Sequence, residues 1–160
     1  GNMYKNAKQG WYKLLNPEKF IIPTNESSSV MKSYKDGCLN YKSGLELKAI
    51  KYCDFNKHIT KFSLEPFAIQ YIKPTDAKVH RYFVDLFIEF STGQKFLVEI
   101  KSSGETKEPR KPSKKTAKAI ENYNHKLMTF AVNKAKWLAA EKFANDRGLK
   151  FIILTEEELG

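Results

Sequence analysis

Apolar and polar residues alternate most regularly between residues 81 and 101. The alternation runs over 81–90 and again over 95–101, and a period of two places successive side chains on opposite faces of a β-strand. Ser91-Thr92-Gly93-Gln94 between them predicts a hairpin turn. The first strand should carry Val84, Leu86, Ile88 and Phe90 on one face, and Phe83, Asp85, Phe87 and Glu89 on the other. We therefore expect an antiparallel β-hairpin here.

Two other segments have the spacing of helices. Residues 43–55 mix apolar and charged side chains, and Ser43 with Glu46 three residues later fits a capping box. A longer helix is expected over about 116–146, and Gly148 suits the left-handed position after its end. The apolar residues expected to face the sheet from this helix are Ile120, Tyr123, Leu127, Phe130, Trp137 and Phe143.

Two short segments complete the predicted sheet. Residues 67–72 read as a strand ended by Lys73-Pro74, and residues 151–154 read as a short buried strand. The order is helix, three strands, helices and strand, which favours an α/β fold with a mixed sheet flanked by helices.

The chain divides into an irregular start and a regular remainder. Its 160 residues fit a single domain. Residues 1–40 lack sustained periodicity and predict an N-terminal arm and loop, whereas residues 41–160 form the core. Gly1 and Asn2, which precede Met3, read as a remnant of expression.

The net charge of the chain limits the classes of binding partner that we expect. Lys and Arg total 28 against 18 acids, a net charge of +10, and such a field attracts polyanions, with nucleic acid as the leading candidate. An acidic membrane surface is the competing partner, but the sequence lacks a strongly basic amphipathic helix with an aromatic face. We expect no membrane association, because no apolar run approaches the roughly 20 residues of a transmembrane helix.

Two cysteines, Cys38 and Cys53, stand 15 residues apart. Without a paired CxxC they do not predict a zinc site, and we expect both thiols to be free, with no disulfide. Residues 1–20 are polar and aromatic without an apolar signal segment, so we expect an intracellular, reducing location.

The candidate chemistry lies on the predicted hairpin. Glu99 and Lys101 are two apart on a strand and project to the same side, and pairing across the turn sets Asp85 opposite residue 99, 100 or 101. Hard oxygen ligands such as Asp85 and Glu99, with the backbone carbonyl of Ile100, suit Mg²⁺, for which Mn²⁺ should substitute. The amine of Lys101 could orient or help deprotonate a water and stabilise developing negative charge. The set suits hydrolysis of a phosphodiester.

A plainer interpretation of the same residues is a surface salt bridge, because an acid and a lysine at strand spacing often lie on a solvated face. Asp85 on the preceding strand, the apolar neighbours of each residue and the basic chain favour the site.

Longer motifs carry a resemblance to a known family. They are Gln9-Gly-Trp-Tyr-Lys13 with Asn16-Pro-Glu-Lys-Phe20, Tyr41-Lys-Ser43 with Glu46, Arg81-Tyr-Phe-Val-Asp85, Phe96-Leu-Val-Glu-Ile-Lys101, Glu105-Thr-Lys-Glu-Pro109 and Arg147-Gly-Leu-Lys-Phe-Ile-Ile-Leu-Thr-Glu156. The chain resembles the head completion nucleases of T4-type bacteriophages, within the PD-(D/E)xK superfamily. Val84 stands where that superfamily often has proline, and residues 24–39 look like an insertion.

The resemblance implies a restriction-endonuclease-like fold, a metal site at Asp85 and Glu99, and a catalytic Lys101. Glu46 falls where these nucleases often carry a helical acid, so it is a further candidate catalytic residue and metal ligand; its role in the capping box is compatible with this. The resemblance also implies a metal-dependent DNA endonuclease of the infected host's cytoplasm, acting on packaged heads and touching head or portal proteins, with the virion head as a second location.

Basic residues near the predicted site are candidates for DNA binding. The loop over 102–115 is polar and mainly basic, and it is either a solvated loop or a flap that exchanges counterions for phosphates. The candidates are Lys42, Arg81, Lys107, Arg110, Lys111, Lys114 and Lys115, with Tyr41 as a weaker one.

Two other functions stay open on the sequence. One is a related endonuclease on the same scaffold, such as a transposon-end endonuclease or a junction resolvase. The other is a structural head-closing protein that keeps the fold but needs no cleavage.

Overall fold

A mixed four-stranded sheet forms the centre of the computed structural model, which describes residues 9–22 and 32–160. The order is β4-β7-β8-β9, with antiparallel neighbours except for the parallel pair β8–β9. The strands are β4 (Ile59–Leu64), β7 (Leu86–Phe90), β8 (Lys95–Ile100) and β9 (Lys150–Leu154). The predicted α/β fold with a mixed sheet is confirmed. Gly1, Asn2 and residues 24–31 of the proposed insertion lie outside the described residues.

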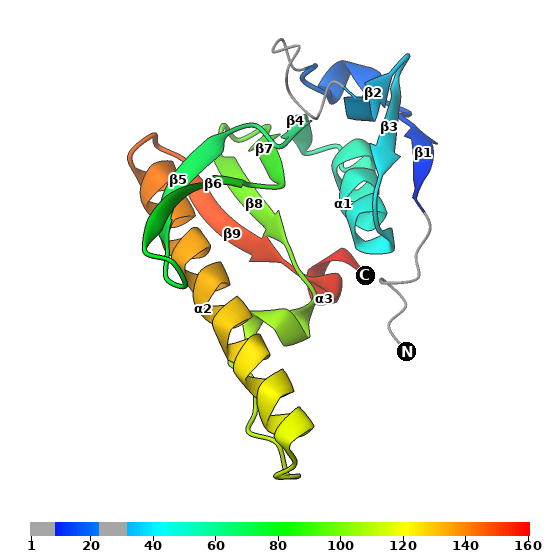
Figure 1. Ribbon diagram of the computed structural model, residues 1–160. Helices are drawn as coiled ribbons and strands as arrows, with labels where there is room; N and C mark the ends of the chain where they lie inside the picture. The colour runs from blue at the N-terminus through cyan, green and yellow to red at the C-terminus, as the bar shows by residue number, and fades with distance from the viewer. Residues whose placement is uncertain (1–8, 23–31) are drawn as a thin grey trace.

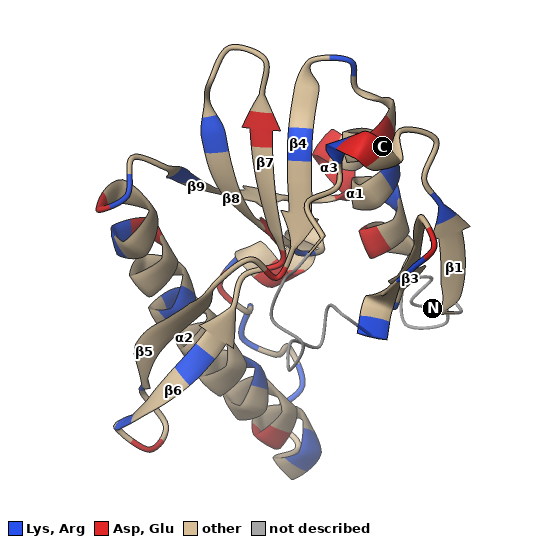
Figure 2. Cartoon of the chain, turned by 90° about the horizontal axis from the view of Figure 1, so that it is seen from above, with Lys and Arg blue, Asp and Glu red and all other residues tan. Residues whose placement is uncertain are grey.

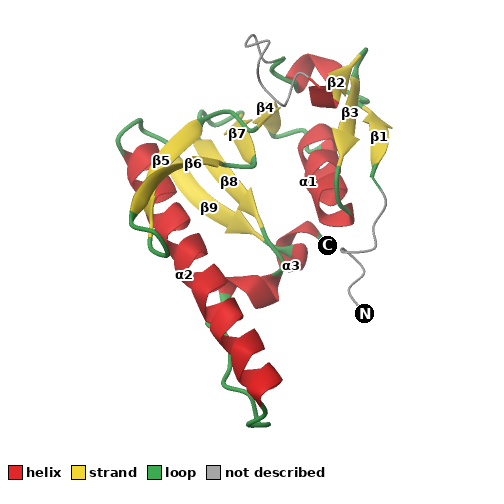
Figure 3. Cartoon of the chain, viewed as in Figure 1, coloured by secondary structure: helices red, strands yellow, loops and turns green. Residues whose placement is uncertain are grey.

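Helices cover both faces of this sheet (Figure 1, Figure 3). On one face α1 (Gly44–Phe55) buries Ala49, Ile50 and Cys53 against Phe62, Leu86, Ile88 and Val98. On the other face α2 (Ala117–Asn145) buries Ala140 and Ala144 against Leu97 and Val84. Neighbouring residues of β8 thus join different core clusters, as the period of two requires.

The predicted hairpin between residues 86 and 100 is confirmed. Leu86 pairs with Val98 and Glu89 with Lys95, and the Phe90 N–H donates to the Gln94 carbonyl at 2.9 Å to close the turn. This register also determines which residue of β8 lies opposite Asp85, the residue before β7.

The strand predicted over 81–90 is instead two strands in two sheets. β6 (Lys78–Phe83) pairs with β5 (Ala68–Lys73) as a separate two-stranded ribbon, and the chain leaves it at Val84 and Asp85 to enter β7. Val84 consequently packs on the α2 side, not with Leu86 and Ile88 as expected. The alternating pattern continues through the break, so the sequence does not reveal it.

An N-terminal sheet occupies much of the segment expected to be an arm. β1 (Gly10–Lys13), β3 (Cys38–Tyr41) and β2 (Tyr34–Lys35) lie side by side in that order, all antiparallel. Leu14, Phe20 and Leu39 are buried in the same cluster as α1, and a short 3-10 helix, η1 (Pro17–Lys19), lies between them in sequence. The described part of residues 1–40 therefore contributes a small sheet and three buried side chains to this cluster.

A buried carboxylate joins this N-terminal sheet to the end of α1. Asp54 is fully buried and accepts hydrogen bonds from the Tyr12 hydroxyl at 2.6 Å and from the N–H groups of Leu15 and Asn16 at 2.9 Å each. Burial raises the pKa of Asp54, but these hydrogen bonds outweigh burial and lower it below the usual range. The Lys19 ammonium donates to three carbonyls at the C-terminal end of the helix, where a cation also complements the helix dipole.

The long helix α2 extends well beyond the sheet, and its first half projects from the body (Figure 1). A helix of 29 residues is about 44 Å long, whereas strands of five or six residues span about 20 Å. Trp137 is buried as predicted, but Ile120 is 44% exposed, and Tyr123, Leu127 and Phe130 are only half-buried. The expectation that all these residues face the sheet is wrong for the first half. Within the described residues, no helix is both long and apolar enough to cross a bilayer.

The C-terminal elements follow the sequence closely. Gly148 has φ +72° after α2, the conformation that favours glycine. Thr155 and Glu158 form a capping box at the start of α3 (Glu156–Leu159). After β8, the loop toward α2 contains a 3-10 turn, η3 (Ser103–Thr106), whose Ser103 N–H donates to the Glu156 carboxylate at 2.8 Å.

Candidate active site

Asp85 and Glu99 meet at one end of the β7–β8 pair. Because Leu86 pairs with Val98, the antiparallel register places Asp85 opposite Glu99. The Ile100 N–H donates to Asp85 Oδ2 at 2.8 Å, which holds the Asp85 carboxylate against the end of β8. The expected convergence across the hairpin is therefore observed.

One of the two acids is buried and the other, Asp85, is half-buried. Glu99 is only 5% exposed. Burial raises the pKa of Asp85 well above its usual range, and the hydrogen-bonded Glu99 and its negative charge raise it further. The Ile100 N–H and the charge of Lys101 act in the opposite direction but do not compensate. Two adjacent carboxylates of this kind repel each other when both are ionised, and they form a good receptor for a cation.

Lys101 places a positive charge beside this pair. Its Nζ lies 3.9 Å from Glu99 Oε2, and its side chain is 26% exposed where that of Glu99 is 7% exposed. The Lys101 N–H donates to the Leu154 carbonyl at 3.1 Å, so the backbone that carries the amine is fixed to the end of β9. Lys101 is thus the more solvent-exposed partner of this ion pair.

Two aromatic residues that the sequence did not assign to the site lie near Glu99. Trp137 of α2 directs its Nε1 toward Glu99 Oε2 at 3.4 Å. The Tyr82 hydroxyl is buried and has no hydrogen-bond partner in the described part of the chain, while burial and the charges of Glu99 and Asp85 raise its pKa. Helical spacing marked Trp137 only as core, and no sequence signal distinguished Tyr82 from the other strand aromatics.

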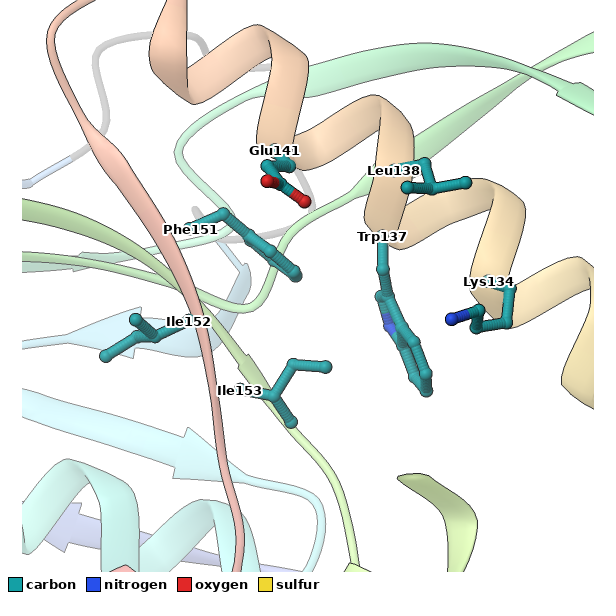
Figure 4. Close-up of a pocket in the computed structure, with 7 residues that line it drawn as sticks. All are labelled: Lys134, Trp137, Leu138, Glu141, Phe151, Ile152 and Ile153. Atoms are coloured by element: carbon teal, nitrogen blue, oxygen red, sulfur yellow. The ribbon is translucent and has the colours of Figure 1, made fainter. Parts of the chain in front are cut away.

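Trp137 also borders a pocket on the outer side of the sheet edge. The pocket has a volume of about 340 Å³ and lies between α2 and β9 (Figure 4). It is lined by Lys134, Trp137, Leu138, Glu141, Phe151, Ile152 and Ile153. The Trp137 indole therefore both contacts Glu99 and lines this pocket.

The structure does not gather Glu46 into the same cluster. Ser43 accepts a hydrogen bond from the Glu46 N–H at 3.1 Å, the expected half of the capping box. Burial raises the pKa of Glu46, which the Lys42 backbone N–H and charge partly offset and the charge of Glu65 reinforces. Among the described residues, no three His, Cys, Asp or Glu side chains form a group able to hold a metal.

The residue set nevertheless fits a magnesium ion better than a zinc ion. Mg²⁺ is usually held by one or two carboxylates and keeps several waters, so the pair of Asp85 and Glu99 is sufficient. Cys38 and Cys53 are free thiols, and Cys53 is buried. A cation would also offset the repulsion that raises the pKa of Asp85.

The predicted DNA-binding residues all reach solvent. In Figure 2, basic segments follow the loop that leads into α2 and continue along that helix. The exposed candidates are Lys42, Arg81, Lys107, Arg110, Lys111, Lys114 and Lys115, and Tyr41 is half-buried. They are accessible, as phosphate contacts require, although exposure is equally true of a solvated loop.

Comparison with known proteins identifies the family of this chain. The family model described as TnsA-like endonuclease N terminal matches residues 56–156, a span that contains Asp85, Glu99 and Lys101. The chain is also 37% identical over 121 residues to the head completion nuclease of Enterobacteria phage T4, an alignment covering 76% of this chain and 81% of that protein. No solved structure gives a significant match. This chain belongs to the TnsA-like endonuclease family and is similar to a phage head completion nuclease.

Proposed function

We propose that this protein is a Mg²⁺-dependent DNA endonuclease that hydrolyses phosphodiester bonds. The observation that carries the proposal is half-buried Asp85 opposite buried Glu99, with the Lys101 amine 3.9 Å from Glu99. Family membership supplies the endonuclease class, and the net charge of +10 favours a polyanionic substrate.

The chain's own residues divide the work. Asp85 and Glu99 would hold the ion, with the Ile100 carbonyl and Glu46 as further candidate ligands. Bound there, Mg²⁺ would supply Lewis-acid stabilisation of charge on the phosphate. Lys101 would orient the attacking water and stabilise the negative charge that develops on phosphorus oxygens. Trp137, which donates toward Glu99, would fix the direction of that carboxylate.

The basic side chains around the site would bind the DNA backbone. Phosphate contacts position a nuclease without reading sequence. Arg81 lies four residues before Asp85, and the basic loop begins directly after Lys101, so both flank the proposed ion site in sequence. These residues would align the scissile phosphate with the two acids.

We place this activity in the completion of phage heads after DNA packaging. The relative's name supports that role, with head or portal proteins as partners and the infected cell's cytoplasm or the virion head as the location. The competing function is a head-closing protein that does not cut. The clustered acids support cleavage, because carboxylates that repel each other without a ligand cost stability and are typical of functional sites.

Nicking of supercoiled plasmid tests the chemistry. The protein should nick in Mg²⁺ or Mn²⁺ and not in EDTA, and Asp85→Asn should be inactive. Glu89→Gln is the matched control, because Glu89 lies in β7 four residues after Asp85, has a side chain 26% exposed and pairs with Lys95 at 3.8 Å. Equal nicking by Asp85→Asn and Glu89→Gln would place the active site elsewhere.

A phage carrying Lys101→Ala tests the biological role. Loss of plaques, with the variant protein verified in the particles, is expected if cleavage completes the head. Normal plaque numbers would instead establish the structural role, since removal of one amine leaves most of the surface unchanged.

A further inference from the structure

The β5–β6 ribbon presents one face that the described residues leave uncovered. Its inner face packs Ile69, Tyr71 and Tyr82 against α2. On the outer face, cross-strand partners Ile72 and Val79 are 64% and 63% exposed. The complete outer face consists of Ala68, Gln70, Ile72, Val79, Arg81 and Phe83. An exposed sheet face with several apolar side chains beside a catalytic residue indicates a binding surface.

The ribbon is held rigidly in shape. In the turn, the Asp76 carboxylate accepts from the Lys78 N–H at 2.9 Å and contacts His80 Nε2 at 2.7 Å. The Ala77 N–H donates to the Lys73 carbonyl at 2.7 Å. A preformed ribbon loses little conformational entropy when a partner covers it.

The polar centre of this face has the chemistry of base recognition. Gln70 and Arg81 stand directly opposite each other, and the Arg81 guanidinium lies 5.8 Å from the centre of the Phe83 ring. Arginine pairs with the guanine O6 and N7 atoms, and glutamine with the adenine N6 and N7 atoms. Apolar neighbours such as Ile72 and Val79 can contact thymine methyl groups.

Charge and dimensions select duplex DNA over a protein partner. Lys73, Lys78 and Arg81 are opposed in the ribbon by Asp76 alone. Arg81 is four residues from Asp85, a path of at most about 13 Å, so a duplex at the site also lies at the ribbon. Two strands about 4.8 Å apart, with their side chains, fit the major groove of about 12 Å and not the minor groove of about 6 Å.

We propose that the outer face of the β5–β6 ribbon enters the major groove, where Gln70 and Arg81 contact purine edges next to the phosphate that is cut. This inference rests on the proposed function for the location of the DNA. It makes the ribbon the element that selects where the protein cuts, whereas the basic loop contributes sequence-independent affinity.

Binding to modified duplexes tests the groove contact. Affinity is measured in EDTA, so that no cleavage occurs, on two duplexes of one sequence, the second with 7-deazapurines in place of its purines. These analogues lack the N7 acceptor in the major groove and keep every phosphate. The unsubstituted protein should bind the second duplex about 5- to 150-fold more weakly for each bidentate pairing that the missing N7 atom disrupts.

Variants assign that difference to the ribbon. Arg81→Ala and Gln70→Ala should weaken binding to the ordinary duplex and reduce the difference between the two duplexes. Lys61→Ala removes one exposed cation from β4 and should leave the difference unchanged. Equal binding of both duplexes by the unsubstituted protein, or an undiminished difference in Arg81→Ala, would overturn the inference and leave the face to a protein partner.

Failure of the inference is separable from failure of the proposed function. Nicking without sensitivity to 7-deazapurines would refute the groove contact and keep the endonuclease. Sensitivity to 7-deazapurines without nicking would support the groove contact and refute the endonuclease.

Discussion

Replacing Asp54 by alanine should cost more stability than any other single carboxylate removed outside the active site. The substitution leaves the Tyr12 hydroxyl and two backbone N–H groups without their acceptor, at positions where the original bonds measure 2.6 to 2.9 Å. A hydrogen bond to a charged group contributes about 1.5–3 kcal/mol, and three such losses are not fully additive because water can enter the space. We therefore expect the free energy of unfolding to fall by about 4 kcal/mol.

Urea and thermal unfolding measure this loss. For a chain of this length, about 4 kcal/mol corresponds to a decrease of roughly 8–16 °C in Tm. Tyr12→Phe removes one of the three bonds and should cost about 1–2 kcal/mol. The control is Asp146→Ala, which removes an exposed carboxylate 2.9 Å from Lys142 and should cost about 0.3–0.5 kcal/mol.

The pH dependence gives an independent check. The pKa of Asp54 is lowered from 3.8 in the folded state, so its contribution is present above 3.8 and is lost as pH falls through the lower folded value. The difference in stability between the unsubstituted protein and Asp54→Asn should shrink over that acid range. If Asp54→Ala unfolded at the same urea concentration as Asp146→Ala, the reasoning would be refuted. Asp54 would then not be what holds the N-terminal sheet to the end of α1.

Three further predictions concern the site. The pKa of Asp85 is raised, so the folded state binds the carboxyl proton more tightly than the unfolded chain does, and the stability of the protein falls as pH rises above 3.8. Thermal melting should therefore find Asp85→Asn more stable than the unsubstituted protein at pH 7 without metal. At strongly acid pH, where Asp85 is protonated in both states, the variant should have no advantage. Lys101→Ala should slow nicking at least about 100-fold while Mn²⁺ binding measured by calorimetry persists, and Lys101→Arg should not restore the rate because a planar guanidinium differs in shape from an ammonium; full activity in either would remove the amine from the mechanism. The third variant neutralises the cations of the loop together, at Lys107, Arg110, Lys111, Lys114 and Lys115. The slope of log affinity against log salt should become less steep by about 0.9 for each phosphate contact that is lost. An unchanged slope would show that the loop is solvated and does not bind DNA.

The convergence of Asp85 with Glu99 could be predicted because local rules determine it. A short turn fixes the register of a hairpin, and the period of two fixes which side chains share a face. Helix limits near Ser43 and Gly148 were equally local, since a capping residue and a glycine with positive φ act on their own neighbours.

Nonlocal contacts explain what could not be predicted. Lys13 pairs with Cys38 in a strand of four residues, too short to show a period. β4 went unrecognised because its pairing with β7 shifts between Ile59 and Lys61, which interrupts the alternation. Trp137 reaches Glu99 because α2 crosses the sheet next to the end of β8 that carries Glu99. The helical spacing of apolar residues does not predict where along the sheet the helix crosses.

The parallel pairing of β8 with β9 has an evolutionary consequence. The connection between them contains the basic loop and the projecting half of α2, but only the second half of α2 packs on the sheet. Doubling the length of a flexible connection costs only about 0.6 kcal/mol in loop-closure entropy. Insertions and deletions in the loop can therefore accumulate while the hairpin that carries Asp85 and Glu99 stays unchanged. Descendants of this chain can thus change how tightly they hold DNA without altering the chemistry they perform on it.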